Sequence, residues 1–353
     1  MQHVVVLCGG RSAEHEISLI SAASVIRNLN PDRYRISVAG IRKDGSTYPA
    51  HELADLLSLE KAHNVDHLPG HNWLAALAAL YPPPDIVFPV LHGPFGEDGT
   101  IQGALEVLDL PYVGSGVSGS AVGMNKIHTK MILARAGLPV LPWVWMDRHC
   151  WERQREEMIA VAESTAAYPL FVKPANMGSS IGVNKSKNRS DLARHIDEAF
   201  RYDDFTVIEK GIEAREIEVS VLGNLEPEAS VAGEIIPSRE FYTYESKYID
   251  ESSRLLIPAP LARDEMERVR SLAIATYRSL QLEGMARVDF LMDKKTGDLW
   301  INEPNTIPGF TSISMYPKLW EASGLEYSDL LDRLIQLGRE RFERRKRLSV
   351  DRV

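Results

Sequence analysis

The chain has 353 residues, enough for two or three domains, with 44% hydrophobic and 25% charged residues as in ordinary globular proteins. A net charge of -9 argues against a general nucleic-acid-binding surface. The two cysteines, Cys8 and Cys150, suit a reducing compartment and provide no disulfide framework. The sequence shows no signal-peptide pattern and no run of about 20 apolar residues, so we expect a cytoplasmic protein without a membrane span.

The first third of the chain alternates apolar runs with a helical segment. Residues 3–7 contain a continuous β-branched run, typical of a buried parallel strand, and further strands are expected at 36–41 and 85–90. A helix through residues 20–26 separates the first two strands. This alternation predicts an open α/β domain whose functional edge lies at the carboxyl ends of its strands.

The rest of the chain predicts two further domains. A turn-rich stretch at 111–116 marks the first boundary, and the division that we expect is 1–114, 115–207 and 208–353. Strands are predicted at 170–173, 206–210, 216–222, 286–292 and 298–302. Helices are predicted at 126–136, 192–199, 262–281 and 327–347.

Two acids and an amide lie around a turn in the last third. Asp289 falls in an alternating strand that begins near Arg287, and Glu303 and Asn305 follow a short hairpin-like interval. An acid in a core strand must be paired or bound to metal, so a solvated face is the weaker interpretation. Oxygen ligands suit Mg²⁺, which usually joins one or two carboxylates to substrate phosphates. The set predicts an enzyme that uses ATP, although the chain contains no P-loop motif.

Lys173 ends an apolar strand, and the small residues 178–182 follow it. Small residues let backbone amides approach a phosphate, and lysine adds a compact positive charge. Taken alone, an ordinary hairpin with a surface lysine explains this segment equally well. A magnesium ligand set elsewhere in the chain favours phosphate binding. Glu209 and Glu216 could meet an adenine or a ribose, although surface charge is the favoured interpretation from these residues alone.

The loop at 9–16 lies where a dinucleotide-binding fold would place its phosphate loop. It lacks the Gly-x-Gly-x-x-Gly pattern, and Glu14 and Glu16 would repel a pyrophosphate. An acidic group there suits an ammonium, which indicates a substrate amine site and disfavours a dehydrogenase. In the glycine-rich loop 91–100, His92 could contact a carboxylate or assist a proton transfer, and a structural histidine is equally expected.

Other patterns are weaker. Residues 96–100 predict a turn and the start of a helix. His63, His67 and His71 recur at four-residue spacing, but a Pro-Gly pair breaks the helix that would align them, so structural zinc is disfavoured. Acids interrupt the basic stretch at 339–347, which favours a solvated helix face over an RNA site.

Six motifs in family order resemble the D-alanine–D-alanine ligases of the ATP-grasp superfamily, and the resemblance covers essentially the whole chain. They are GGRSAEHEIS at 9–18, LHGPFGEDGT at 91–100, MNK at 124–126, GSSIG at 178–182, YESKY at 244–248 and NTIPGFT at 305–311. One motif alone would be suggestive, whereas six in order are highly specific. The resemblance implies an α/β ATP-grasp fold, with an N-terminal open α/β domain, a central lid domain and a C-terminal α+β catalytic domain.

For the nucleotide, the resemblance implies a site between the central and C-terminal domains. The phosphate ligands that it implies are Lys126, Lys173 and Lys247. Adenine would meet Glu209 and the backbone of Lys210 and Ile212, with Phe241 against the base and Glu216 at the ribose. Ser179, Asn302 and Glu303 complete the ATP contacts. Asp289, Glu303 and Asn305 would hold two Mg²⁺ ions, for which Mn²⁺ may substitute.

For the substrates, the resemblance implies that Glu14 binds the ammonium of the first D-alanine and that His92 lies near it. Arg287 and the amide of Gly309 would stabilise the tetrahedral oxyanion. Ser314 and Met315 would receive the carboxylate of the second D-alanine. Ser179 and Tyr248 would complete the closed site, under a lid expected at 238–254.

The implied reaction joins two D-alanines through an acyl phosphate, releases ADP and phosphate, and supplies peptidoglycan synthesis. The form of the YESKY motif favours D-alanine as acceptor, and a ligase for D-lactate or D-serine is the nearest alternative. A nucleotide-binding protein without turnover is a second alternative, disfavoured by the intact metal and lysine set. The resemblance also implies a homodimer.

Overall fold

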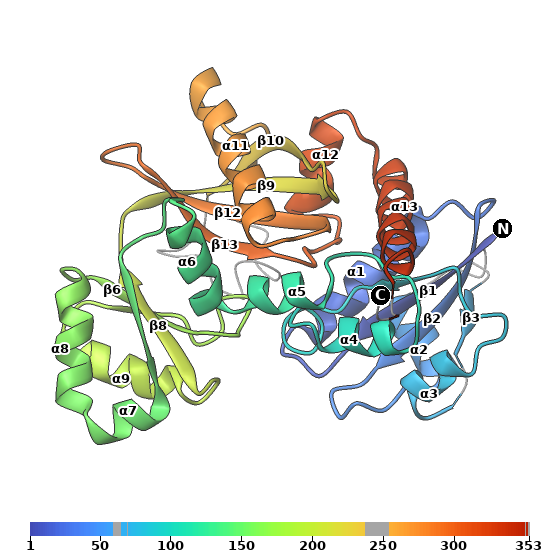
Figure 1. Cartoon of the computed structure of the whole chain (residues 1–353), viewed down its shortest axis with the longest axis horizontal. Coiled ribbons are helices and arrows are strands. Elements are labelled where there is room, and N and C mark those ends of the chain that lie inside the picture. The colour runs from blue at the N-terminus through green and yellow to red at the C-terminus, as the bar shows by residue number, and fades with distance from the viewer. Residues whose placement is uncertain (59–64, 69, 237–253, 350, 352–353) are drawn as a thin grey trace.

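The computed structural model describes residues 1–58, 65–68, 70–236, 254–349 and 351. Figure 1 shows three parts, each built around its own sheet. Among the described residues, no helix combines the length and the apolar character that a membrane crossing needs. The mixed α/β architecture expected from the sequence is confirmed.

The first sheet has the strand order β3-β2-β1-β4, and all its pairs are parallel. Its strands are β1 (Gln2–Gly9), β2 (Tyr34–Ile41), β3 (Val65–His67) and β4 (Ile86–Pro89). The helices of this part are α1 (His15–Asn28), α2 (Ala50–Leu57), α3 (Trp73–Ala78) and α4 (Thr100–Val107). β1 is buried from its second residue onward, as its continuous apolar run predicts. The loops after β1 and β4 leave from the same edge, because parallel strands end on one side.

The middle sheet is antiparallel, with the order β5-β8-β6-β7. Its strands are β5 (Trp143–Asp147), β6 (Leu170–Pro174), β7 (Asn184–Ser186) and β8 (Phe205–Lys210). One apolar core joins it to α7 (Arg148–Arg153), α8 (Arg155–Thr165) and α9 (Arg189–Ala199). The boundary expected between residues 207 and 208 falls inside β8.

The third sheet has the order β11-β10-β9-β12-β13 and is antiparallel. Its strands are β9 (Ala214–Gly223), β10 (Glu228–Ile236), β11 (Arg254–Leu256), β12 (Gly284–Asp293) and β13 (Leu299–Asn305). The remaining helices are α5 (Val117–Met124), α6 (Lys126–Arg135), α11 (Arg263–Ser279), α12 (Met315–Ala322) and α13 (Tyr327–Lys346). α5 packs against β13 and α6 against α11, so these two helices lie on the third sheet.

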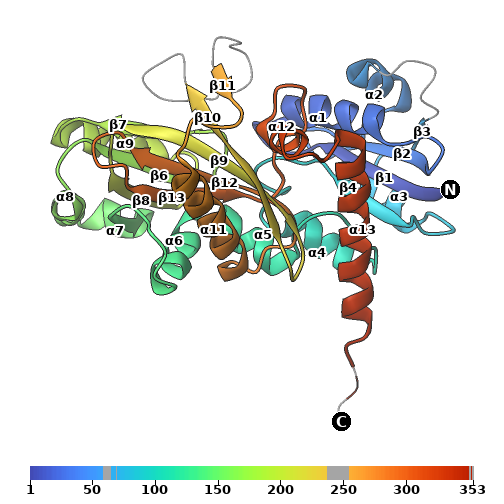
Figure 2. The same cartoon turned by 90° about the horizontal axis from the view of Figure 1, so that it is seen from above.

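The largest apolar core joins the first and third parts. It contains Val6 and Phe88 of the first sheet, Met285 of the third sheet, and Leu330 and Leu334 of α13. Figure 2 shows α13 running alongside the first part, with its C-terminal end projecting away from the body. This shared core fixes the carboxyl edge of the first sheet against the third sheet, and the candidate site lies there.

Candidate active site

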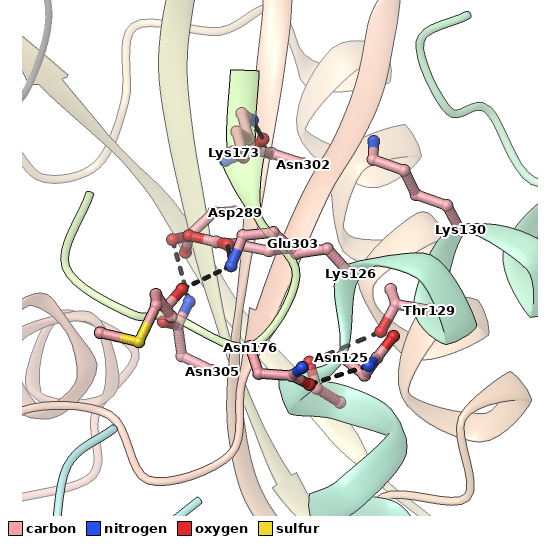
Figure 3. A network of polar contacts seen from close by, with 12 residues as sticks. Asn125, Lys126, Thr129, Lys130, Lys173, Asn176, Asp289, Asn302, Glu303 and Asn305 are labelled. Atoms are coloured by element: carbon pink, nitrogen blue, oxygen red, sulfur yellow. Dashed lines mark hydrogen bonds and ion pairs between the residues drawn. The ribbon is translucent and has the colours of Figure 1, made fainter. Parts of the chain in front are cut away.

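The predicted metal ligands come from two neighbouring strands. β12 and β13 are paired so that Arg287 lies opposite Asn305 and Asp289 opposite Glu303, with a register irregularity just after Asp289. Arg287 donates from Nε to Asp289 Oδ1 and from Nη2 to Oδ2, both at 2.7 Å, and its Nε lies 3.0 Å from Glu218 Oε2. Asn305 Nδ2 donates to Asp289 Oδ2 at 3.0 Å (Figure 3). The pairing brings all three predicted ligands to one edge of the hairpin.

This donor set fits a hard divalent cation. Glu303 lies 3.2 Å from the ammonium of Lys126, so each carboxylate already meets a protein cation. In the part of the chain that the structure describes, no three His, Cys, Asp or Glu side chains converge as metal ligands. The third protein ligand would therefore be the Asn305 amide, whose oxygen and nitrogen exchange places by a flip. Two carboxylates and an amide oxygen suit Mg²⁺ better than Zn²⁺.

Two lysines, Lys126 and Lys173, lie beside the predicted metal ligands. Lys126 Nζ donates to the Met177 carbonyl at 2.7 Å, and its backbone N–H donates to the Ala175 carbonyl at 2.9 Å. Lys173 donates to Asn302 Oδ1 at 3.1 Å and forms an ion pair with Glu209. Lys173 is therefore buried and is not a surface residue. The hairpin of the alternative interpretation is nevertheless present, since β6 and β7 pair antiparallel.

Glu209 is buried and bound by two cations, Lys173 and Lys130, the latter at 2.7 Å. Burial alone would raise the pKa of the Glu209 carboxyl, but the two ammonium groups more than offset it and hold the pKa at about 2. Burial lowers the pKa of Lys130, whereas the acids Glu209 and Glu303 outweigh burial and raise that of Lys173. Both carboxylate oxygens of Glu209 thus face lysines, and its contact with adenine stays a prediction.

A cleft of about 340 Å³ lies between the middle and third sheets. It is the size of a small-molecule site. Nine of the residues predicted for ATP or metal line it: Lys126, Lys173, Glu209, Lys210, Ile212, Glu216, Asp289, Asn302 and Glu303.

A second, smaller pocket of about 80 Å³ adjoins this cleft. The predicted substrate residues line it, together with Ser179 and Asn305: Glu14, His92, Arg287, Gly309, Ser314 and Met315. Lys126 and Glu303 line both spaces. A group that reacts with a nucleotide phosphate would therefore meet it beside these two side chains.

Glu14 is held in place at one wall of the small pocket. Its backbone N–H donates to Ser12 Oγ at 2.9 Å, and the Ser179 hydroxyl donates to its carboxylate. A Cβ atom on Gly178 would come within 2.7 Å of Glu14 Oε2, and one on Gly93 within 2.5 Å. Two glycines therefore make room for a carboxylate that Ser179 orients across the boundary between the first and middle parts.

Gly309 and the start of α12 also line the small pocket. A Cβ on Gly309 would lie 2.6 Å from Ser314 Oγ, so only glycine fits without a shift. Ser314 Oγ accepts the Thr311 N–H at 3.0 Å, and Met315 begins α12. The free N–H groups at a helix start favour an anion, which is consistent with the predicted carboxylate contact.

His92 is buried against the substrate pocket. Its Nδ1 lies 2.9 Å from the Ile307 carbonyl and its Nε2 3.1 Å from Ser21 Oγ. Burial lowers the pKa of His92 to about 4, so the ring is neutral at pH 7. Both ring nitrogens thus have protein partners, as in the structural alternative.

Three buried charged residues in or beside the site were not singled out from the sequence: Glu97, Lys130 and Glu218. Lys130 follows Lys126 by four residues on α6, and this spacing puts both side chains on one face of a helix. The turn and helix start predicted at 96–100 are confirmed, since α4 begins at Thr100. The Glu97 side chain in addition accepts backbone N–H groups from Gly93 and Ile307. Phe241, Lys247, Tyr248 and His63 lie outside the described residues.

Comparison with known proteins identifies the family. The model of the D-ala D-ala ligase N-terminus matches residues 3–115, and that of the D-ala D-ala ligase C-terminus matches residues 132–336. A D-alanine–D-alanine ligase of Heliobacterium modesticaldum is 47% identical over 100% of this chain and 98% of its own length. One from Thermoanaerobacter sp. strain X514 is 50% identical over 96% of each.

Solved structures agree. The D-alanine-D-alanine ligase of Coxiella burnetii has a TM-score of 0.82 and 36% identity, over 98% of this chain and 96% of that one. VanG D-Ala:D-Ser ligase of Enterococcus faecalis has a TM-score of 0.81 and 33% identity, over 96% of this chain and 99% of that one. The fold is thus the ATP-grasp fold. The chain belongs to the D-alanine–D-alanine ligase family.

Proposed function

We propose that this chain joins two D-alanines to D-alanyl-D-alanine at the expense of ATP, for bacterial peptidoglycan synthesis. The observation that carries the proposal is the meeting of two spaces at Lys126 and Glu303. One is a cleft of the size of a small-molecule site, and the other is a small pocket that is lined both by Glu14 and by the start of α12. This is the arrangement that a carboxylate–amine ligase needs, because a small amino acid must reach the terminal phosphate.

In the first step, the carboxylate of the first D-alanine attacks the γ-phosphate of ATP, and ADP leaves. Glu14, oriented by Ser179, would hold the ammonium of this substrate. Lys126 and Lys173 would bind the phosphates, with Lys210, Ile212 and Glu216 at the adenosine. Asp289, Glu303 and Asn305 would hold two Mg²⁺ ions, which supply charge neutralisation at the transferring phosphoryl group.

In the second step, the amine of the second D-alanine attacks the acyl-phosphate carbonyl, and phosphate leaves. Arg287 and the Gly309 amide would stabilise the oxyanion, a contribution of about 3–4 kcal/mol per donor. Ser314, Met315 and the start of α12 would bind the second carboxylate. Arg287 already lies between Glu218, Asp289 and the small pocket, so its task needs only a local change of partner.

Phosphate release from Mg-ATP with D-alanine, L-alanine, D-serine or D-lactate tests the proposal. We expect release with D-alanine, loss of release when Mg²⁺ is omitted, and recovery with Mn²⁺. A D-serine acceptor is the second candidate, since a D-Ala:D-Ser ligase shares the fold at 33% identity. Folded protein that releases no phosphate above background with D-alanine would contradict the main proposal.

The wider setting is proposed on the same basis. We propose three domains at 1–114, 115–207 and 208–353, a cytoplasmic location, and a homodimer without nucleic-acid or membrane partners. Sedimentation equilibrium tests the dimer, and a single monomer mass at micromolar concentration would contradict it.

A further inference from the structure

The peptide group of Ile307 is held on both sides by the loop that follows β4. The Ile307 carbonyl lies 2.9 Å from His92 Nδ1, and the Ile307 N–H donates to Glu97 Oε2 at 3.1 Å. Both side chains are nine-tenths or more buried. Two residues of the first part, five positions apart, therefore hold the carbonyl and the amide of one residue beyond β13.

The hydrogen-bond partners fix the state of His92. The Ile307 carbonyl can only accept, so Nδ1 carries the proton, and Nε2 accepts from the Ser21 hydroxyl at 3.1 Å. The oxygen of Ser21 in turn accepts the Phe310 N–H at 3.3 Å. Ser21 thereby links the His92 ring to the far end of the same segment.

Phe310 is anchored independently. Its side chain is fully buried, with ring centroids 5.9 Å from Phe88 and 6.4 Å from Tyr327. The Tyr327 hydroxyl donates to the Phe310 carbonyl at 3.0 Å. The residue before Pro308-Gly309 and the residue after it are both fixed, and Gly309 itself lines the substrate pocket.

Glu97 uses both of its oxygens. Oε1 accepts the Gly93 N–H at 2.9 Å while Oε2 accepts that of Ile307. A carboxyl group offers one acceptor oxygen to each N–H group in either protonation state, whereas a glutamine would set its NH2 donor against one of them. Glu97 therefore joins the Ile307 segment to Gly93, where an added Cβ would come within 2.5 Å of Glu14 Oε2.

We propose that His92, Glu97 and Ser21, here called the Ile307 clamp, are positioning residues that set the Gly309 amide and the start of α12 for the second step. The clamp ties the oxyanion and carboxylate wall of the pocket to the loop beside Glu14. It acts through Ile307 and Phe310, without touching the substrate. The inference rests on the proposed function.

Matched variants test the clamp. His92→Asn keeps an amide N–H donor near the position of Nδ1, which meets the Ile307 carbonyl. His92→Gln places its amide near the position of Nε2 and leaves the Ile307 carbonyl without this donor. We expect Glu97→Gln and His92→Gln to lower kcat about 10- to 100-fold, since misplacing a reacting group by about 1 Å costs roughly that much. The KM for the second D-alanine should rise, while the KM values for ATP and the first D-alanine stay within about threefold. His92→Asn should recover most of the lost rate.

Gln102→Leu is the control for a purely structural effect. Gln102 is buried and donates to the carbonyl of Gly96, which belongs to the same loop, at 2.8 Å. It should lower the melting temperature and leave both D-alanine KM values unchanged. If Glu97→Gln and His92→Gln behave like Gln102→Leu, the clamp has no positioning role.

An equal rise in the KM for the first D-alanine in His92→Asn and His92→Gln, with no other kinetic change, would instead show direct substrate contact by His92. That result would overturn the inference. Wild-type protein without phosphate release on D-alanine would contradict the proposed function itself. The two failures are thus distinguished by the activity of the wild type.

Discussion

At the scale of single residues, Glu209 shows how a buried charge depends on its partners. Lys130 and Lys173 hold the pKa of its carboxyl at about 2 against the opposing effect of burial. Lys130→Met removes one of the two cations and leaves the carboxylate with Lys173 alone. We expect a loss of about 3 kcal/mol in unfolding free energy, as for other broken buried pairs.

The same change should affect the nucleotide. With Lys130 absent, Glu209 draws Lys173 more strongly, away from Asn302 and the cleft. The KM for ATP should therefore rise, as measured by steady-state phosphate release, while urea unfolding gives the stability. Lys130→Arg, which keeps the charge, should retain most of both properties. A Lys130→Met protein of wild-type stability would refute this account of Glu209.

His92 predicts a dependence of stability on pH. Its pKa is lowered by burial to about 4, against 6.5 in the unfolded chain, so its contribution is complete above pH 6.5 and lost as the pH falls toward 4. Between pH 7 and 5 this loss is about 2 kcal/mol. The contribution of Glu97 to stability increases as the pH falls, because burial and Glu14 raise the pKa of its carboxyl group to about 8.

The difference between wild type and His92→Asn isolates the histidine. We expect the variant to lose less stability than wild type between pH 7 and 5, by about 2 kcal/mol in urea unfolding. Parallel pH profiles of the two proteins would contradict the assignment of a buried, neutral ring.

The residue scale also shows how far the sequence could predict the site. Asp289, Glu303 and Asn305 could be grouped because neighbouring strands of a hairpin bring nearby sequence together. Lys126 and Lys173 line the cleft that the resemblance predicted. The role of Glu97 could not be found, because its partner Ile307 is 210 positions away and the acceptor geometry exists only after the two parts dock.

At the scale of elements, the loop between β6 and β7 is shaped around Glu14. Gly178 leaves space for the carboxylate. Its φ lies outside the left-handed region, so an alanine would fit the backbone conformation and only its Cβ would cause a clash. Gly178→Ala would place a Cβ 2.7 Å from Glu14 Oε2 and move the carboxylate away from the small pocket. We expect the KM for the first D-alanine to rise about tenfold or more, as for the loss of one charged hydrogen bond.

Gly103→Ala in α4 is the matched control. Its added Cβ meets nothing within 4 Å, and alanine is favoured over glycine in a helix interior by up to about 1 kcal/mol. Its kinetic constants should equal those of wild type. If both alanine variants have unchanged D-alanine KM values, Gly178 is not needed for the position of Glu14.

Elements with strong patterns were predicted well, and those set by packing were not. The apolar run of β1 and the long periodic helices α11 and α13 lie close to their predicted ranges. β5, β10 and α12 were not singled out, because their half-buried or mixed residues lack a clear period. The order β11-β10-β9-β12-β13 depends on pairing between distant segments, which no local pattern encodes.

At the scale of the whole molecule, the cores divide the chain differently from the sheets. One core contains residues of the first sheet, the third sheet and α13, whereas the core around the middle sheet draws only on residues between 144 and 208. Because a shared core opens cooperatively, we expect the first and third parts to unfold as one unit and the middle part to open separately. The lid role that we propose for the central domain needs this difference, because a lid moves over a fixed platform.

Hydrogen exchange in two core variants tests this division. Leu334 and Leu192 are both fully buried, in the shared core and in the middle core respectively. Replacing either by alanine should cost about 2–5 kcal/mol. Leu334→Ala should reduce amide protection in β1, β4, β9 and β12 together, and Leu192→Ala only in the middle sheet and its helices. Loss of protection confined to α13 in Leu334→Ala would show that the first and third parts open independently, and the site would then lack a common rigid platform.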